Sequence, residues 1–338
     1  MTVSARNLAW LLVPLTLLSA LFALTVGPSA LSAAQVWQAL WHPGADVDGL
    51  IVWQIRLPRL LLALCVGALL GISGALIQGL FRNPLAEPGL MGVSSGATLA
   101  VVATLIFAPS ALALLPAPLQ TLARPATAFI GGLVATQLVM LIGRDSAGSP
   151  LRLILAGVAF NMMAVAGLGL CSYLATNEQL RTLTFWTLGS FGAANWQAVA
   201  ITVFVLMIIT LLAWPLHKPL NALLLGESEC RHLGFDVPRL KRRIIYLCAA
   251  GVGAAVAFTG IIGFIGLVVP HMVRLLVGPD HRRVLPLSLG FGALLTLWAD
   301  WLARVVISPA ELPVGIITAL LGGPFFIYLI HRQRSIGL

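Results

Sequence analysis

Residues 60–80 read LLLALCVGALLGISGALIQGL and carry no charged side chain. A helix needs about 20 mainly apolar residues to cross the hydrocarbon core of a bilayer. The stretch therefore predicts a transmembrane helix. Similar apolar stretches follow one another along the chain, so the sequence predicts an all-α polytopic membrane protein.

The composition of the 338-residue chain excludes a soluble protein of this length. Of its residues, 59% are apolar and 9% are charged, whereas a soluble globular domain carries about 25% charged residues. The same composition excludes a basic nucleic-acid-binding arm, so we expect no nucleic-acid partner. The four cysteines show no paired spacing, and we therefore expect no metal or redox site.

We expect about ten transmembrane helices in a single domain that covers residues 1–338. The first apolar stretch follows Arg6 and resembles a signal peptide, but it is longer than the roughly 7–15 apolar residues of such a peptide. We therefore keep it as a helix. The expected spans are Leu8–Val26, Leu60–Leu80, Leu90–Phe107, Ala126–Ile142, Leu153–Leu174, Ala198–Trp214, Ile244–Ile262, Phe264–Val277, Leu285–Ile307 and Val314–Ile330.

The basic residues give the expected orientation. With ten spans both termini lie on one side of the membrane, and placing them in the cytoplasm assigns 15 of the 20 Lys and Arg residues to that side. Lys and Arg concentrate in cytoplasmic loops of membrane proteins. The net charge of +9 therefore indicates topology and gives no sign of an acidic partner.

Two long segments are expected outside the bilayer. Residues 27–59 form an outer-face loop with three tryptophans, and residues 215–243 form the largest cytoplasmic loop. The cytoplasmic loop carries acidic side chains among six basic ones. So polar a segment in so apolar a chain is a candidate docking surface for a soluble partner.

Small residues recur in the second span. Gly67, Gly71, Ala75 and Gly79 follow one another every four positions and share one helix face. In lipid, such spacing lets helix backbones approach closely. We expect this face to pack against another helix, with a sliding contact as the alternative.

The chain carries a weak internal repeat. Arg56-Leu57-Pro58-Arg59 precedes Cys65 by the spacing at which Arg239-Leu240-Lys241-Arg242 precedes Cys248. The offset relates the second span to the seventh, five helices later, so the two copies run in opposite directions. Inverted repeats of this kind are common in transporters. We therefore consider an inverted repeat of helices 2–5 and 7–10.

Two other functions are open at this stage. Gly71-Ile72-Ser73-Gly74 matches the motif around the nucleophile of intramembrane serine proteases, but a serine needs an adjacent base, and His271 is expected at the far end of its span. Asp300 and Arg304 can form an intramembrane ion pair, which an ion-coupled secondary transporter could use. No Walker A sequence is present, so we expect no catalytic residue in this chain.

Four blocks of the sequence resemble the FecCD family, the permease subunits of type II ABC importers for siderophores, haem and cobalamin. The resemblance covers about residues 50–330. Its blocks are Arg56–Gly96 with the R-N-P-L-A turn at residues 82–86, Phe185–Ser190, Leu225–Gly234, and Gly263–Gly315 with G-L-V-V-P-H at residues 266–271.

The resemblance implies an assembly and roles for particular residues. The partners would be a second permease copy, two ATPase subunits that bind ATP and Mg, and a periplasmic binding protein. The ATPase-coupling loop would contain Gly226, Glu227, Glu229, His232, Leu233 and Gly234. Arg56 and Arg59 would dock the binding protein, and Asn83, Pro84 and Leu85 would form an inner gate. To these we add Asn161, Met162 and Met163 of the fifth span as expected pathway-lining residues.

The expected cargo is an iron chelate. Haem is expected ahead of a ferric siderophore or cobalamin, because residues 79–96 resemble haem permeases somewhat more than siderophore permeases. The protein is expected in the inner membrane of a bacterium, with no cofactor of its own.

Overall fold

The computed structural model describes residues 5–27, 31–42, 46–109, 114, 116–143 and 150–334, and all regular structure in these ranges is helical. Each of the ten expected spans coincides with one helix, which confirms the all-α membrane fold. These helices are α1 (Ala5–Thr25), α4 (Leu57–Phe81), α5 (Val93–Phe107), α7 (Ala117–Ile142), α8 (Pro150–Leu174), α10 (Trp196–Ala213), α13 (Val237–Thr259), α14 (Ile265–Val277), α15 (His281–Val305) and α16 (Val314–Arg334).

Seven of the described helices are long and apolar enough to cross a bilayer, and α5, α14 and the Val314–Ile327 part of α16 are shorter apolar helices. Two of these shorter helices, α5 and α14, begin after the expected start of their spans, because the residue that precedes each helix has a left-handed backbone conformation. Gly92 precedes α5 with φ of +75°, and Phe264 precedes α14 with φ of +67°. The seventh and eighth spans, nearly continuous in sequence, are separated at this turn.

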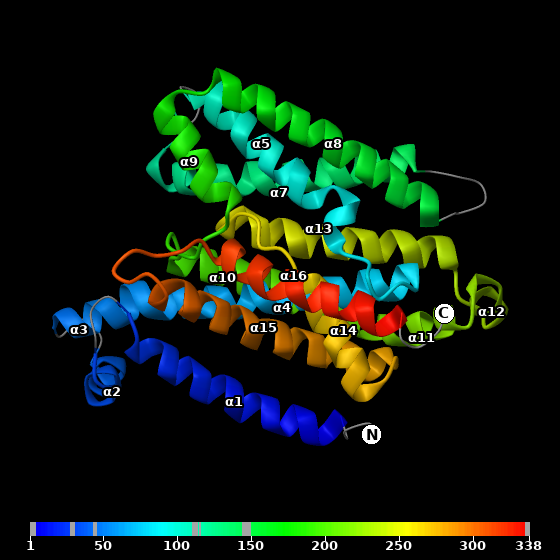
Figure 1. Ribbon diagram of the computed structural model, residues 1–338, viewed down its shortest axis with the longest axis horizontal. Coiled ribbons are helices and arrows are strands. Elements are labelled where there is room, and N and C mark those ends of the chain that lie inside the picture. Colours follow the sequence, from blue (N-terminus) through cyan, green and yellow to red (C-terminus); the bar gives the residue numbers. More distant parts are fainter. Residues whose placement is uncertain are drawn as a thin grey trace.

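Short helices cover the two ends of the bundle (Figure 1). One end carries α2 (Ala33–Trp41), α3 (Val47–Leu50), the π-helix Ile51–Arg56 and α9 (Asn177–Thr187). The loop of residues 27–59 therefore contains short helices. The other end carries the 3₁₀ turn Trp214–Leu216, α11 (His217–Leu224) and α12 (Glu227–His232). Helix α1 starts and α16 ends at the α11–α12 end, as an even number of spans requires.

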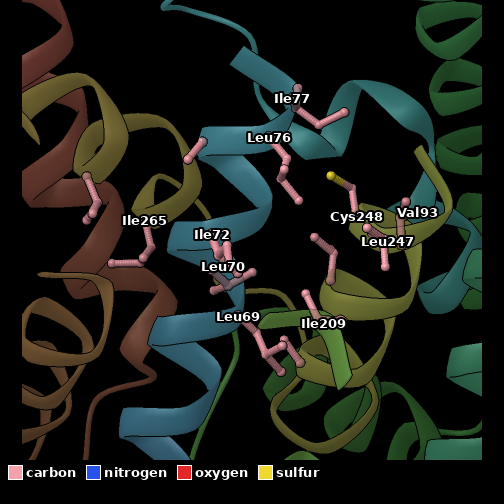
Figure 2. Packing of buried hydrophobic residues seen from close by; sticks show 14 of the residues in the cluster. Leu69, Leu70, Ile72, Leu76, Ile77, Val93, Ile209, Leu247, Cys248 and Ile265 are labelled. Carbon is pink, nitrogen blue, oxygen red and sulfur yellow. The ribbon is translucent and has the colours of Figure 1, made fainter. Parts of the chain in front are cut away.

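Helix α4 forms the centre of the bundle. Its most apolar segment of 18 residues is 89% buried, compared with 22% for the corresponding segment of α1 and 17% for that of α8. Figure 2 shows the reason: Leu69 and Leu76 of α4 point towards side chains of α10 and α13, including Ile209 and Leu247. A helix that is apolar on all sides belongs inside a bundle, and the outer faces of α1 and α8 remain exposed for lipid.

The small residues of α4 bring backbones into contact. A Cβ atom on Gly67 would lie 2.2 Å from the carbonyl oxygen of Gly292, and one on Gly71 would lie 2.1 Å from that of Ser288, both in α15. A Cβ atom on Gly74 would lie 1.9 Å from the carbonyl oxygen of Gly266 in α14. These positions accept no side chain, so the expected close packing is present.

The packing also follows the pattern of an inverted repeat. Helix α4 packs against α15 and α14, whereas α13 packs against α7 and α5. These are corresponding partners if helices 2–5 repeat as helices 7–10. Figure 1 shows that α4 starts at the α3 end and α13 at the α12 end, so the two central helices run in opposite directions.

Candidate functional site

The segment between α10 and α13 builds a surface on one end of the bundle. Helix α11 buries one face, made of Pro219, Leu220, Ala222 and Leu223, and exposes the other. In α12 only Cys230 is buried, and its Sγ lies 3.7 Å from the carbonyl oxygen of Pro219. Burial and the nearby Glu227 raise the pKa of this thiol. These contacts fix both short helices to the bundle.

Glycines set the turns on both sides of α12. Gly226 has φ of +126° and Gly234 has φ of +87°, a region that L-residues with side chains rarely adopt. A Cβ atom at either position would meet nothing within 4 Å. The backbone conformation, and not the available space, therefore requires glycine at these two positions.

The two glutamates of α12 have different surroundings. Glu227 accepts a hydrogen bond of 2.7 Å from Lys241 of α13 and lies 3.7 Å from Arg231. Glu229 is exposed, and no ion pair to it is found among the described residues. Glu227 therefore ties α12 to a spanning helix, and Glu229 presents its charge to solvent.

Apolar side chains stand beside Glu229. Leu225 is 70% exposed and Leu233 is 59% exposed, and His232 is exposed between them. Large apolar groups on a polar end of a membrane protein are not needed for contact with lipid, and such patches mark protein interfaces. The α12 surface, defined here as Leu225, Glu229, His232 and Leu233, has the composition of a docking site.

A chain of hydrogen bonds leads from α11 to the central helix. Asn221 donates through Nδ2 to Asp280 at 2.6 Å, and its Oδ1 accepts from the backbone N–H of His281 at 2.8 Å. The His281 ring lies 2.9 Å from the same oxygen through Nδ1 and 3.3 Å from Arg274 through Nε2. Arg274 in turn donates to Gln78 of α4.

Gln78 closes this chain by donating to the carbonyl oxygen of Leu267 at 3.0 Å. Burial alone would raise the pKa of Asp280, but hydrogen bonds from Asn221 and from the Arg282 amide, together with the Arg283 charge, lower it. The carboxylate is thus held in its charged form. The result is a rigid polar path from α11 into the end of α4.

Helix α4 ends in the R-N-P-L-A turn. Arg82 is left-handed with φ of +50°, and the Asn83 side chain accepts from the Leu85 amide at 2.9 Å, so the helix cannot continue. Asn83 is exposed, whereas Pro84 and Leu85 are half-buried. The following segment packs against α8, because Asn161 donates to the carbonyl oxygen of Gly89 at 3.2 Å. Asn161 therefore contacts the segment that follows the predicted gate residues.

Met162 and Met163 are placed differently. They are 69% and 70% exposed on α8, away from the turn at residues 82–89 that Asn161 contacts. The sequence expectation grouped the three residues because they are adjacent. Adjacent residues on a helix point about 100° apart, and only Asn161 reaches this turn.

The sequence profile of the FecCD transport family matches residues 15–332. The chain belongs to this family. Its similarity to the hemin transport permease HmuU of Yersinia pestis is 42% identity over 334 residues, which cover 97% of this chain and 96% of the relative. The vitamin B12 import permease BtuC of Vibrio cholerae is 38% identical over 329 residues, covering 97% and 94%.

A solved structure also resembles this FecCD chain. It is described as a metal-chelate type ABC transporter in an inward-facing conformation, and it aligns with a TM-score of 0.84 and 33% identity over 97% of this chain and 99% of that one. The chain is thus a transport permease of the membrane, in agreement with its sequence.

The arginines expected to dock a binding protein are not exposed in this FecCD chain. Arg56 is 6% exposed and donates to the carbonyl oxygen of Leu24, and Arg59 is 8% exposed. Arg59 lies 2.9 Å from Asp300 and 2.7 Å from Glu311, and Arg304 lies 3.2 Å from Asp300. Buried guanidinium groups need such partners. Both side chains are thus engaged within the protein, and docking of a binding protein through them stays a prediction.

The predicted intramembrane ion pair of Asp300 and Arg304 is part of this larger cluster. Asp300 and Arg304 do lie together, but Arg59 shares Asp300, and the Arg304 side chain also donates to the carbonyl oxygen of Val26 at 2.9 Å. The cluster ties α1, α4 and α15 together near the α2–α3 end. Sequence reasoning missed Glu311 as a partner because spacing within one helix cannot reveal a contact across 252 positions.

The alternative chemistries find no support in the described part of the chain. The Ser73 hydroxyl is buried without a hydrogen-bond partner, and neither ring nitrogen of His271 has one. Among the described residues, no base therefore lies within hydrogen-bonding distance of the Ser73 hydroxyl. Among the described residues no three His, Cys, Asp or Glu side chains gather as a metal site would require.

Proposed function

We propose that this FecCD permease is the membrane subunit of an ATP-driven importer that moves haem from a periplasmic binding protein into the cytoplasm across a bacterial inner membrane. ATP and Mg would bind to two separate ATPase subunits, and a second copy of this chain would complete the pathway. The α11–α12 end would face the cytoplasm, and so would both termini. The excess of basic residues assigned to that side supports this orientation.

The observation that carries the proposal is the α12 surface. It presents Leu225, Leu233 and Glu229 to solvent while Glu227 and Lys241 fasten α12 to α13 at 2.7 Å. A rigid surface element joined to a span can pass a rigid-body motion into the bundle. We infer that each ATPase subunit binds here, with Gly226 and Gly234 fixing the turns.

The ion-coupled alternative is less well supported. A carboxylate that carries protons or sodium has to be free to bind them, whereas Asp300 lies between Arg59 at 2.9 Å and Arg304 at 3.2 Å and is fully buried. Its charge is compensated within the protein, as expected for a structural cluster. This arrangement favours ATP as the energy source.

Haem as the cargo rests on similarity. The hemin permease of Y. pestis is 42% identical, and the vitamin B12 permease of V. cholerae is 38% identical. Cobalamin is therefore the second candidate, and a ferric siderophore the third. The experiment is uptake into proteoliposomes that contain the permease and its ATPase, with binding protein loaded with haem, a ferric siderophore or cobalamin.

The proposal predicts that, of the three cargoes, haem is taken up in the presence of ATP and the other two are not. Uptake of cobalamin or siderophore would correct the cargo and leave the importer intact. A variant with Glu229→Arg would be run beside the wild type. If this variant bound the ATPase as tightly as the wild type, the α12 surface would not be the docking site.

A further inference from the structure

A crevice of about 630 Å³ lies on the side of the bundle that carries α1. Helices α1, α4, α10 and α15 line it, and most of the lining side chains are apolar. Those that form its walls include Leu12, Leu17, Leu64, Ala68, Leu206 and Leu289. Its volume is within the range of about 300–1,000 Å³ typical of small-molecule sites.

The crevice exists because α1 contacts α15 at a narrow point. Leu12 is 8% exposed and packs on Gly290, where a Cβ atom would lie 2.4 Å from the leucine Cδ2. Val13 and Leu17 at the rim are 60% and 61% exposed. In a membrane these exposed side chains face acyl chains, so the crevice opens to lipid and not to water.

Three arginines surround the end of the crevice that lies towards α11 and α12. Arg6 at the start of α1, and Arg282 and Arg283 at the start of α15, line it. Arg283 lies 3.8 Å from Asp280, and among the described residues no carboxylate pairs with Arg6 or Arg282. An apolar crevice therefore ends in an excess of positive charge.

We propose that this crevice binds an anionic phospholipid, with an acyl chain between α1 and α15 and the phosphate among Arg6, Arg282 and Arg283. Guanidinium groups bind phosphate through charge-assisted hydrogen bonds. Basic pockets between spanning helices on the cytoplasmic side are suited to anionic headgroups. A zwitterionic lipid would place its ammonium group near three guanidinium groups, which disfavours it.

The site has a direct connection to the α11 contact. Arg282 and Arg283 follow Asp280 and His281, whose side chains or backbone bond to Asn221. A lipid phosphate on the arginines would hold the first turn of α15 in place, and with it the partner of α11.

The test is native mass spectrometry of the full chain with added phosphatidylglycerol or phosphatidylcholine of identical acyl chains. The crevice variant is Arg6→Gln with Arg282→Gln. The control variant is Arg239→Gln with Arg242→Gln, which removes the same charge from exposed positions at the same end of the bundle. All four side chains are exposed, so both variants are expected to fold.

We expect the wild type and the control variant to bind phosphatidylglycerol at least tenfold more tightly than phosphatidylcholine. The affinity of the crevice variant for phosphatidylglycerol should fall about tenfold or more, and its affinity for phosphatidylcholine should stay unchanged. Equal losses in both variants, or equal binding of the two lipids by the wild type, would overturn the proposal. Inorganic phosphate is the third probe: if it displaces the lipid at comparable concentration, the arginines bind a free anion and the crevice holds no acyl chain.

Discussion

Replacing Asp300 with asparagine should destabilise the protein more than the removal of an exposed charge does. The substitution Asp300→Asn keeps the size of the side chain and removes its charge. In the wild type this carboxylate, 1% exposed, lies 2.9 Å from Arg59 and 3.2 Å from Arg304. Removing it leaves two buried guanidinium groups without their shared partner.

The size of the effect follows from the remaining contacts. Breaking a buried ion pair by removing one partner costs about 3–5 kcal/mol. Arg59 keeps Glu311 at 2.7 Å, and the Glu311 side chain is 35% exposed, so water can reach part of the cluster. We therefore expect the free energy of unfolding to fall by about 3 kcal/mol, at the lower end of that range.

A matched control separates burial from charge. Asp236→Asn removes the partner of Arg239, but the two side chains are 46% and 80% exposed. Exposed pairs contribute about 0–1 kcal/mol, and asparagine also serves as an N-cap for α13. The assay is reversible denaturant unfolding of both variants in the same detergent micelles. A loss below about 1 kcal/mol for Asp300→Asn, or equal losses for both, would refute the structural role of the cluster.

Three further predictions concern packing and coupling. Gly71→Ala should lower the thermal unfolding midpoint, because its Cβ would lie 2.1 Å from the Ser288 carbonyl oxygen, whereas Gly169→Ala, with nothing within 4 Å, should leave it unchanged or raise it. Glu229→Arg should weaken ATPase binding in a pull-down titration without lowering stability. Glu227→Gln should lower stability, since Glu227, unlike Glu229, accepts a hydrogen bond from Lys241. Asn221→Ala should reduce the number of cargo molecules imported per ATP hydrolysed while the ATPase stays bound; an unchanged ratio would show that the path through His281 carries no coupling.

The fold was largely predictable because each membrane-spanning helix requires a long apolar stretch of sequence. Each expected span coincides with a helix, and the face of Gly67 and Gly71 does pack against a neighbour. Helix boundaries were less accurate where apolar character gave no signal. Helix α4 begins at Leu57, before the apolar stretch. Arg59 is buried within this helix because it pairs with carboxylates of other segments, so its charge does not mark the helix end.

The segment that carries the candidate site was predictable as a surface element, whereas its internal contacts were not. Charge alone marked residues 215–243 as a surface segment, and α11 and α12 lie there. Charge alone could not distinguish Glu227 from Glu229, because the difference lies in Lys241, 14 residues away on another helix. The same limit hid the Asn221 contact with His281, which joins residues 60 positions apart.

The most direct test of the central claim is the energy source of transport. The permease would be reconstituted with its ATPase subunit and haem-loaded binding protein, and haem uptake would be measured with ATP inside the vesicles, with a non-hydrolysable analogue, and with an imposed proton or sodium gradient. The account predicts uptake with ATP alone, and loss of that uptake in the Glu229→Arg variant. Uptake that follows the ion gradient without ATP would contradict it and would make Asp300 the centre of the mechanism.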